Sequence, residues 1–382
     1  MILTKLYNEF FHSEKTAGII LIFATLTSIF LANSSLHDSY LAFWNIEIGH
    51  HSLVHWINDG LMALFFLLIG LELEREIYEG ELSNLKKASL PIAAAVGGMI
   101  IPATIFVLIN SGLPTIDGAG IPMATDIAFA IGILSLLGNR VPASLKIFLT
   151  ALAVIDDLGA IVVIALFYTK TISATYLFGA LTVYALLIIL NRLKVCVLWP
   201  YLIGGIIMWY LMLNSGVHAT ITGVLLAFAI PFGKSKERSP SFFLQHLLHK
   251  PVAFFILPVF ALANTGISIA SDWGQNLLSA GSLGIILGLV IGKPLGIVFF
   301  SYLAVKLNVS ALPEKVNWKI ISATGFLAGI GFTMSIFITL LAYTDEAIIV
   351  NSKMAILIGS FIAGLVGFLL LSLFLKHNKA AK

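Results

Sequence analysis

Ile147-Phe-Leu-Thr-Ala-Leu-Ala-Val-Ile-Asp-Asp-Leu-Gly-Ala-Ile-Val-Val-Ile-Ala-Leu-Phe167 is an apolar stretch interrupted by two adjacent carboxylates, Asp156 and Asp157. An apolar run of about 20 residues is long enough to cross a bilayer as a helix. A charged side chain near the bilayer centre costs at least about 2.5 kcal/mol, so such residues usually mark a path for ions or protons. We therefore expect this stretch to form a spanning helix that carries a functional site.

Composition extends this expectation to the whole chain. Hydrophobic residues make up 59% of the sequence and charged residues only 11%, whereas soluble domains carry about 25% charged residues. The sequence therefore predicts an all-α membrane protein that crosses the lipid bilayer many times. Nucleic acid is not an expected partner.

Polar breaks divide the apolar sequence into twelve expected spanning helices. They cover residues 16–33, 54–73, 89–110, 119–138, 146–169, 174–191, 195–213, 216–232, 243–266, 282–305, 318–342 and 351–375. With a cytoplasmic N-terminus, this order places all but three of the 22 Lys and Arg residues on the cytoplasmic side. Lys170 and Lys353 fall on the other side, and Lys293 falls within the membrane. The positive-inside rule thus predicts that both termini are cytoplasmic.

The segment Tyr40–His50 lies between the first two predicted spans. Its apolar residues Trp44, Ile46 and Ile48 alternate with polar ones. This period of two predicts a short strand or a small extracytoplasmic β-hairpin, and an interfacial loop with aromatic anchors explains it equally well.

Two predicted spans contain residues that interrupt a helix. Asp126 follows a run with two glycines and Pro122, so we expect a second half-helix to begin near Pro122 or Asp126. The partial positive charge at that helix start would stabilise the Asp126 carboxylate. The eleventh span contains Gly325, Gly329 and Gly331. Irregular backbone at membrane depth persists only where it is buried in protein or lines a wet cavity.

The tenth span carries glycines at strict four-residue spacing, Gly284, Gly288, Gly292 and Gly296. Such a stripe lets another backbone approach closely. Lys293 borders this face, where it can neutralise carboxylates or complement the negative C-terminal ends of two half-helices.

The interrupted fourth and eleventh spans each lie in the middle of a group of three spans, and the two groups start on opposite sides of the membrane. This arrangement predicts inverted-topology repeats whose two interrupted helices cross near the middle of the membrane.

The charged residues predict cation chemistry. In a helix, Asp156 and Asp157 point about 100° apart, so one can face Asp126 and an ion while the other faces Lys293. Na⁺ and Li⁺ prefer carboxylate, carbonyl and hydroxyl oxygens, and Thr125 offers a hydroxyl beside Asp126. The same oxygens bind protons or a cation but not both. Together with alternating access, this competition predicts cation/proton exchange that needs no cofactor.

Five segments carry a family resemblance: Phe65-Phe-Leu-Leu-Ile-Gly-Leu-Glu-Leu-Glu-Arg-Glu, Ala124-Thr-Asp-Ile-Ala-Phe-Ala-Ile-Gly, Val154-Ile-Asp-Asp-Leu-Gly-Ala-Ile, Gly292-Lys-Pro-Leu-Gly-Ile and Gly329-Ile-Gly-Phe-Thr-Met-Ser-Ile-Phe. They closely resemble the NhaA family of bacterial Na⁺/H⁺ antiporters, and the likeness extends from about residue 10 to 375.

The resemblance implies a role for each residue of the site. Asp157 matches the main ion-binding acid of the family, and Asp156 the adjacent acid that is linked to proton transfer and to the lysine. Asp126 and Thr125 match the acid and hydroxyl of the broken fourth helix. Lys293 matches a lysine that is either a structural charge or a proton carrier. The implied activity is electrogenic exchange of cytoplasmic Na⁺ or Li⁺ for external protons, which serves Na⁺ and pH homeostasis and is not enzymatic.

The resemblance also implies an assembly and a location. We expect a single polytopic domain over residues 1–382, with a core bundle at about 89–169 and 282–375 and an interface part at about 16–80 and 174–266. A homodimer would form through the extracytoplasmic hairpin near Tyr40–His50, in the bacterial inner membrane.

The pH-response cluster of the family maps partly onto the second and ninth spans. The matching residues are Glu72, Arg75, Glu76, His246 and His249. A charged helix end explains the first three equally well. A family glutamate of the ninth span is Gln245 here, which puts the pH profile in question but not the exchange.

Three other functions fit the sequence less well. Intramembrane aspartyl proteases need Tyr-Asp and Gly-x-Gly-Asp motifs, which neither Asp126 nor Asp157 has. A sodium-coupled symporter should have a separate polar pocket for an organic solute. A passive cation channel would need neither the acid pair nor Lys293.

Overall fold

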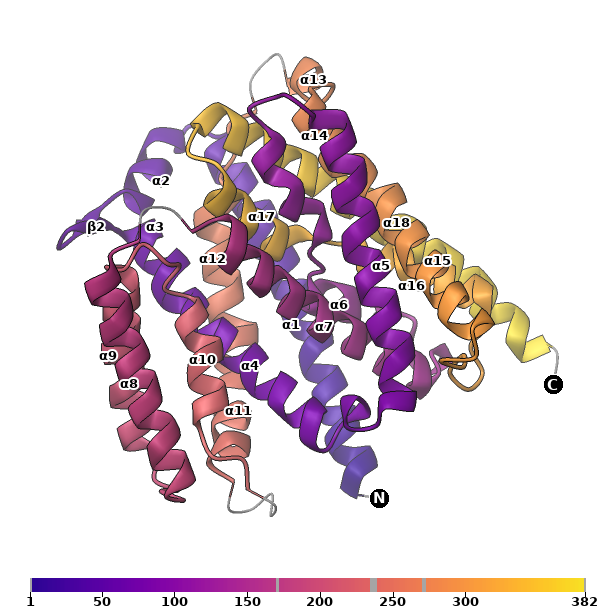
Figure 1. Cartoon of the computed structure of the whole chain (residues 1–382). Coiled ribbons are helices and arrows are strands. Elements are labelled where there is room, and N and C mark those ends of the chain that lie inside the picture. The colour runs from indigo at the N-terminus through magenta and orange to yellow at the C-terminus, as the bar shows by residue number, and fades with distance from the viewer. Residues whose placement is uncertain (1, 170–171, 234–238, 270–272, 381–382) are drawn as a thin grey trace.

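The computed structural model describes residues 2–169, 172–233, 239–269 and 273–380, which are almost entirely helical (Figure 1). The first part of the chain forms α1 (Ile2–Ala32), α2 (His37–Trp44), β1 (Glu47–Ile48), β2 (His51–Ser52), α3 (Leu53–Trp56), η1 (Ile57–Leu61) and α4 (Met62–Tyr78). The middle part forms η2 (Glu81–Ser83), α5 (Leu85–Asn110), η3 (Ile116–Met123), α6 (Ile127–Leu136), η4 (Gly138–Arg140), α7 (Ala143–Phe167), α8 (Ala174–Arg192), α9 (Trp199–Leu213) and α10 (Ile221–Ala229). The last part forms α11 (Pro240–Pro251), η6 (Val252–Ile256), α12 (Leu257–Asn264), α13 (Trp273–Asn276), α14 (Ala280–Leu287), η7 (Gly288–Gly292), α15 (Lys293–Lys306), α16 (Trp318–Ala328), α17 (Phe332–Ala342) and α18 (Glu346–Ala380).

Nine helices in the described ranges are long and apolar enough to cross a membrane, and the bent pair α16–α17 makes a tenth span. These ten coincide with the predicted spans one to six and nine to twelve. The predicted seventh and eighth spans correspond to shorter helices, α9 with 15 residues and α10 with nine. At 1.5 Å per residue, α10 is about 13 Å long, less than half of a bilayer core of about 30 Å. The count of twelve spanning helices therefore stays a prediction.

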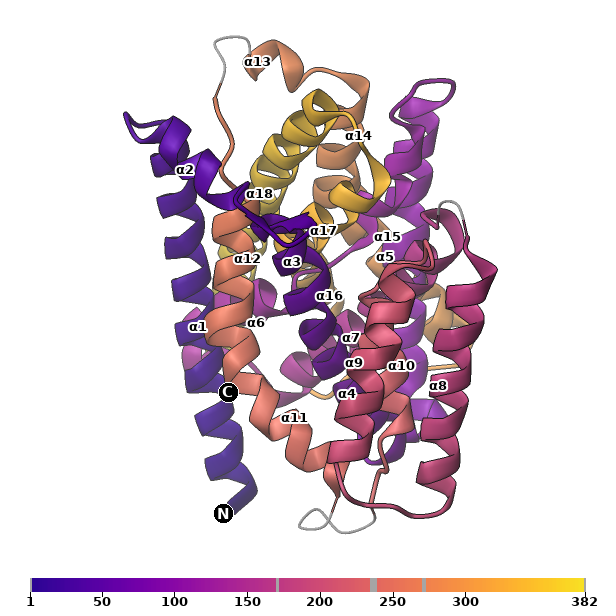
Figure 2. The same cartoon turned by 90° about the vertical axis from the view of Figure 1, so that its left-hand side faces the viewer.

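The segment between the first two spans is less extended than its alternating pattern indicated. Helix α2 includes Tyr40 and Trp44, whose rings meet edge to face at 6.0 Å between centroids. Within the part of the chain that the structure describes, strand pairing is limited to β1 and β2, which pair antiparallel with two residues each. The apolar spacing in this segment thus belongs partly to a helix face, where residues four apart are neighbours. Figure 1 shows β2 at the left-hand side of the molecule, next to α2 and α3, and Figure 2 views the molecule from that side.

Glycines bring several helices into close contact. An added methyl group on Gly97 of α5 or Gly296 of α15 would collide with the carbonyl oxygen of the other. In the same way, a methyl on Gly223 of α10 would collide with the carbonyl oxygen of Ala63 in α4. The glycine stripe of the tenth span is therefore a packing surface for α5, as its spacing predicted.

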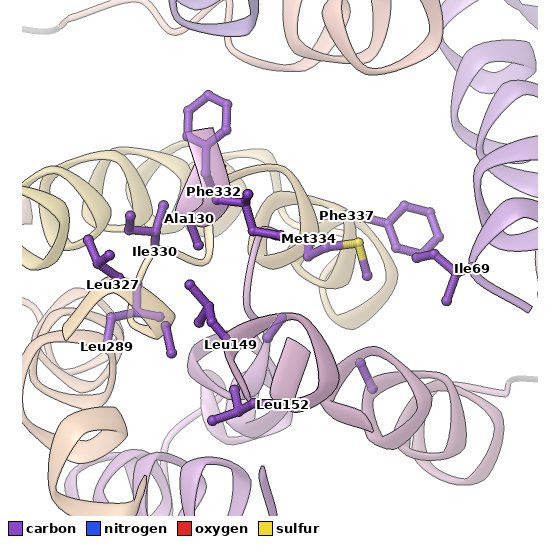
Figure 3. Close-up of a cluster of buried hydrophobic side chains, with 14 of the residues drawn as sticks. Ile69, Ala130, Leu149, Leu152, Leu289, Leu327, Ile330, Phe332, Met334 and Phe337 are labelled. Atoms are coloured by element: carbon purple, nitrogen blue, oxygen red, sulfur yellow. The ribbon is translucent and has the colours of Figure 1, made fainter. Parts of the chain in front are cut away.

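Apolar side chains surround the two interrupted helices. Figure 3 shows Leu149 and Leu152 of α7 facing Leu327, Ile330 and Met334 from the region of α16 and α17, and all five are buried. A second apolar cluster joins α8, α9 and α10 to one face of α4, and α8 and α9 lie side by side at an edge of the molecule (Figure 1). The interrupted helices thus lie within the larger core, away from that edge.

Candidate functional site

The first break separates η3 from α6. Residues Ala124–Asp126 leave the helical conformation, and α6 begins at Ile127 with Asp126 as its N-cap. The Phe129 N–H donates to Asp126 Oδ1 at 3.0 Å. The predicted start of the second half-helix near Asp126 is confirmed, and the cap satisfies one of the unpaired N–H groups of the new helix.

The second break separates α16 from α17, whose axes differ by 48°. A side chain of α18 supplies the hydrogen-bond acceptor for this break. The N–H groups of Gly331 and Phe332 both donate to Ser360 Oγ at 3.2 Å.

The two breaks lie directly against each other. The Asp126 N–H donates to the Ile330 carbonyl at 2.6 Å, and Asp126 Oδ2 accepts from the Thr333 N–H at 3.1 Å and from the Thr333 hydroxyl. Both carboxylate oxygens of Asp126 are therefore occupied by donors at the starts of two helices, α6 and α17. A buried carboxylate is well stabilised at such positive helix ends.

Lys293 is fully buried and meets two acceptors. Its ammonium group donates to Asp156 Oδ2 and to the carbonyl oxygen of Met123. Met123 ends η3, so the ammonium also lies at the negative C-terminal end of that half-helix. Thr125 Oγ1 lies 2.6 Å from Asp156 Oδ2 and 2.8 Å from the Ala328 carbonyl oxygen. The Thr125 hydroxyl thus contacts Asp156 and the second break, and its expected part in cation binding beside Asp126 stays a prediction.

Asp157 contrasts with its neighbour. It is 1% exposed, and its Oδ1 accepts no hydrogen bond within the ranges that the structure describes. Asp156 Oδ1 is also without a donor there, but Asp156 Oδ2 is ion-paired. A buried polar atom without a partner is costly. Among the described residues, the site therefore holds one ion-paired acid, Asp156, and one acid, Asp157, whose Oδ1 has no donor.

The acids do not form a ready-made cation cage. Across the described residues, the structure has no group of three or more His, Cys, Asp or Glu side chains arranged to hold a metal ion. Asp126 is committed to helix ends, so carbonyl and hydroxyl oxygens or water would have to complete the coordination of an ion at Asp157.

A cleft leads toward the acids between α4, α7 and α11. Its lining includes Thr150 and Val154, which precede Asp157 on α7, and also Ala128 beside the first break. Apolar side chains line most of its length. Four of the six predicted pH-response residues line the cleft as well: Glu72, Arg75, Glu76 and His249.

The predicted pH-response residues thus fall into two sets. Glu72 Oε1 lies 3.8 Å from His249 Nδ1, and Arg75 pairs with Glu76 at 3.2 Å. Gln245 is buried on α11, and His246 stacks on the ring of Phe242. Neither of these two residues belongs to the lining of the cleft.

Sequence reasoning missed two residues near these features. Thr333 binds Asp126, and its signal is its place in the first turn of α17, directly after the second break. Glu74 is only 4% exposed and accepts from the Ser241 hydroxyl at 2.7 Å. It follows Leu67 and Leu71 at helical spacing on the buried face of α4, so periodicity could have found it.

Known proteins provide an independent line of evidence. Residues 8–371 match the model of a family described as Na⁺/H⁺ antiporter 1. The chain is 63% identical over 378 residues to the Na⁺/H⁺ antiporter NhaA of Flavobacterium psychrophilum, covering 99% of this chain and 98% of the relative. NhaA proteins of Dechloromonas aromatica and Vibrio cholerae are 60% and 50% identical, with at least 98% of each sequence covered. The chain therefore belongs to the Na⁺/H⁺ antiporter 1 family, the family of the NhaA antiporters.

Proposed function

We propose that this protein is an electrogenic antiporter that exchanges cytoplasmic Na⁺ or Li⁺ for external protons. Its family supports Na⁺/H⁺ exchange by a transporter and not by an enzyme. The observation that carries the proposal is the buried Asp157 carboxylate, which has an oxygen without a donor beside an ion-paired Asp156. Such a group is stabilised by a proton or by a cation. Because each excludes the other, their movements across the membrane are coupled without any cofactor.

Electrogenic exchange requires more than one proton for each Na⁺. Asp157 can hold one proton, and the Asp156–Lys293 pair is a second unit that can hold another. Thr125 is well placed to stabilise the charged form of Asp156 when Lys293 moves away, because its hydroxyl lies 2.6 Å from Asp156 Oδ2. In this scheme Lys293 carries a proton; as a purely structural charge it would leave Asp156 as the second proton site.

The route to the site supports alternating access. The cleft connects the charged end of α4 with residues one turn from Asp157. We place this end in the cytoplasm, together with both termini, because most Lys and Arg residues lie on that side. In the bacterial inner membrane, the core part (89–169 and 282–375) would move against the interface part (16–80 and 174–266). The two contacting breaks would then be the crossing point of inverted repeats near mid-membrane.

Two further roles follow from the surroundings of the site. Glu72 and His249, and Arg75 and Glu76, lie in pairs along the cleft, so we assign the pH response of the exchange to this end of the cleft. The hairpin of β1 and β2 leaves strand edges exposed, which can pair with a second copy in a homodimer. Together these features suit a protein of Na⁺ and pH homeostasis.

Everted membrane vesicles test the proposal. Na⁺ or Li⁺ should dissipate an acid-inside proton gradient, and the rate should change with an imposed membrane potential. Absence of any response between about pH 6.5 and 9 would overturn the proposal. Asp157→Asn should abolish exchange while the protein still accumulates in the membrane. Asp38→Asn, at an exposed aspartate of α2, is the matched control and should leave exchange unchanged.

A further inference from the structure

The helix that carries Lys293 is not a regular α-helix. Helix α14 continues into the π-helical turn η7, after which α15 begins at Lys293. The Lys293 N–H donates to the Gly288 carbonyl, five residues back, where a regular α-helix would use the carbonyl four residues back. Such a turn accommodates one additional residue, so it shifts the facing of all later residues by about 100°.

This shift explains the glycine stripe. In a regular α-helix, the segment from Gly284 to Gly296 turns by about 1,200°, which would leave the two glycines about 120° apart. Because η7 accommodates one additional residue, the angle between Gly284 and Gly296 around the helix axis falls to about 20°. The structure agrees, because a methyl group on any glycine of the stripe would lie within 3.5 Å of an atom of α5. The π-turn is therefore what keeps both halves of this helix packed on α5.

Pro294 favours the π-turn at its observed position, η7. Proline has no N–H to donate, and its ring clashes with the carbonyl four residues back, at a cost of about 3 kcal/mol inside an α-helix. Here that carbonyl belongs to Val290, inside η7, where the pairing has already changed to five residues. A π-turn displaced by a full turn toward the N-terminus would leave Pro294 in a regular helical turn, and one displaced by one residue toward the C-terminus would need the N–H that Pro294 lacks.

A second place in the molecule has the same design. The π-turn η6 ends with the Leu257 N–H donating to the Val252 carbonyl, and Pro258 follows as the second residue of α12. The third π-turn of the described residues, η1, is followed by Met62 and Ala63 without a proline. Proline thus accompanies two of the three π-turns at the same position.

We propose that Pro294 is a positioning residue for Lys293, because it holds the π-turn at η7 and so fixes the direction in which Lys293 leaves the helix. Lys293 points about 100° away from Gly292 and the α5 face, toward η3 and α7, where it meets Met123 and Asp156. A π-turn that moved past Lys293 would return this residue to the register of α14 and turn it away from Asp156. The inference deepens the role of Lys293 and rests on the proposed exchange function.

The test is a double-mutant cycle on the thermal unfolding of the purified full-length protein in detergent. Pro294→Ala should lower the melting temperature more in the wild-type background than in Lys293→Ala, because only the former has an ion pair to lose. The additional fall should be roughly 2–4 °C. Equal falls in both backgrounds overturn the proposal. Pro258→Ala, the matched control at η6, should give equal falls in both.

A second variant covers the case in which Pro294→Ala does not fold. Deleting Val290 from Pro294→Ala removes the additional residue and lets a regular α-helix join the two packed halves. This variant should fold, and replacing Lys293 by alanine in it should again lower its stability. Failure to fold, or an unchanged stability after the Lys293 replacement, overturns the proposal. Because these readouts are independent of transport, failure of the cycle is distinguishable from an absence of Na⁺/H⁺ exchange.

Discussion

The two helix breaks meet the same requirement with different groups. The first break caps its ten-residue helix α6 with its own acid, Asp126. The second break consists of Gly329-Ile-Gly331, directly before the eleven-residue helix α17, and has no acid of its own. It relies on the Ser360 hydroxyl from α18 and on Asp126 from the first break.

This difference shows how one buried charge can serve two helix starts. The positive ends of α6 and α17 converge on the Asp126 carboxylate, so a second acid is unnecessary there. The comparison also distinguishes the roles of the acids, because Asp126 joins the breaks whereas Asp157 keeps an oxygen without a donor. Substitutions at the two breaks should therefore differ in size in a defined order.

The largest effect is expected from Asp126→Ala, which removes the acceptor at both helix starts. Three donors lose their partner, and we expect the free energy of unfolding to fall by about 3 kcal/mol or more and exchange to be lost. Denaturation of the purified protein and vesicle assays measure both. Asp345→Ala is the control, because this exposed acid caps only the start of α18. A loss no greater than that of the control would contradict the double role of Asp126.

Gly329→Ala should disturb the second break without touching the first. A methyl group there would collide with the Leu289 carbonyl oxygen and lie 3.2 Å from Ala363 Cβ. We expect a loss of about 1–3 kcal/mol in the free energy of unfolding, as for other overpacked sites. Gly274→Ala, where no atom of the described residues lies within 4 Å of the added methyl, should change stability little. Equal stability of the two variants would show that the second break adapts more easily than its contacts indicate.

Thr333→Val tests the link between the breaks with little change in shape. The hydroxyl donor to Asp126 disappears while the backbone N–H donor remains. We expect a loss of about 1.5–2 kcal/mol in stability and a higher apparent KM for Na⁺. Thr333→Ser retains the hydroxyl and should restore most of both. If serine and valine behave alike, the hydroxyl has no part in holding Asp126.

Ser360→Ala should have the smallest effect of the four. The Gly331 and Phe332 N–H groups lose a neutral acceptor, which should cost about 1 kcal/mol and leave exchange nearly normal. Thermal unfolding next to Thr333→Val gives the comparison. A larger loss for Ser360→Ala than for Thr333→Val would mean that the second break depends more on α18 than on Asp126.

The long helices and both breaks could be predicted because their causes are local. Apolar runs set the spans, and the residues around Pro122 and Gly329 prevent a continuous helix. Helical geometry also predicted that one of the two adjacent acids faces Lys293, and the family resemblance implied that this acid is Asp156. The bonds of Asp126 to Thr333 could not be predicted in this way, because the two residues are 207 positions apart in the chain.

Other differences have equally physical reasons. Apolar composition reports burial and does not set helix length, which is why the predicted seventh and eighth spans appear as α9 and α10. The break between them contains Ser215, which is fully buried and whose carbonyl accepts from the Ser173 N–H at 2.8 Å. Glu74 was overlooked because its charged neighbours made this part of the sequence look like an exposed helix end, although Glu74 lies on the buried face of the helix. Near Trp44, the alternating pattern was too short to distinguish a strand from a helix face.

The contact between the two helix breaks limits how this part of the molecule can move. Besides the bonds of Asp126, the Ser335 hydroxyl donates across it to the Ile121 carbonyl at 2.7 Å. Separating the interrupted helices would leave several buried donors and a carboxylate without partners, so we expect the four half-helices to move as one rigid body in any transport cycle. Sliding is far less costly along the largely apolar walls of the cleft between α4 and α7. A bound ion would accordingly move together with both breaks and would not pass from one break to the other.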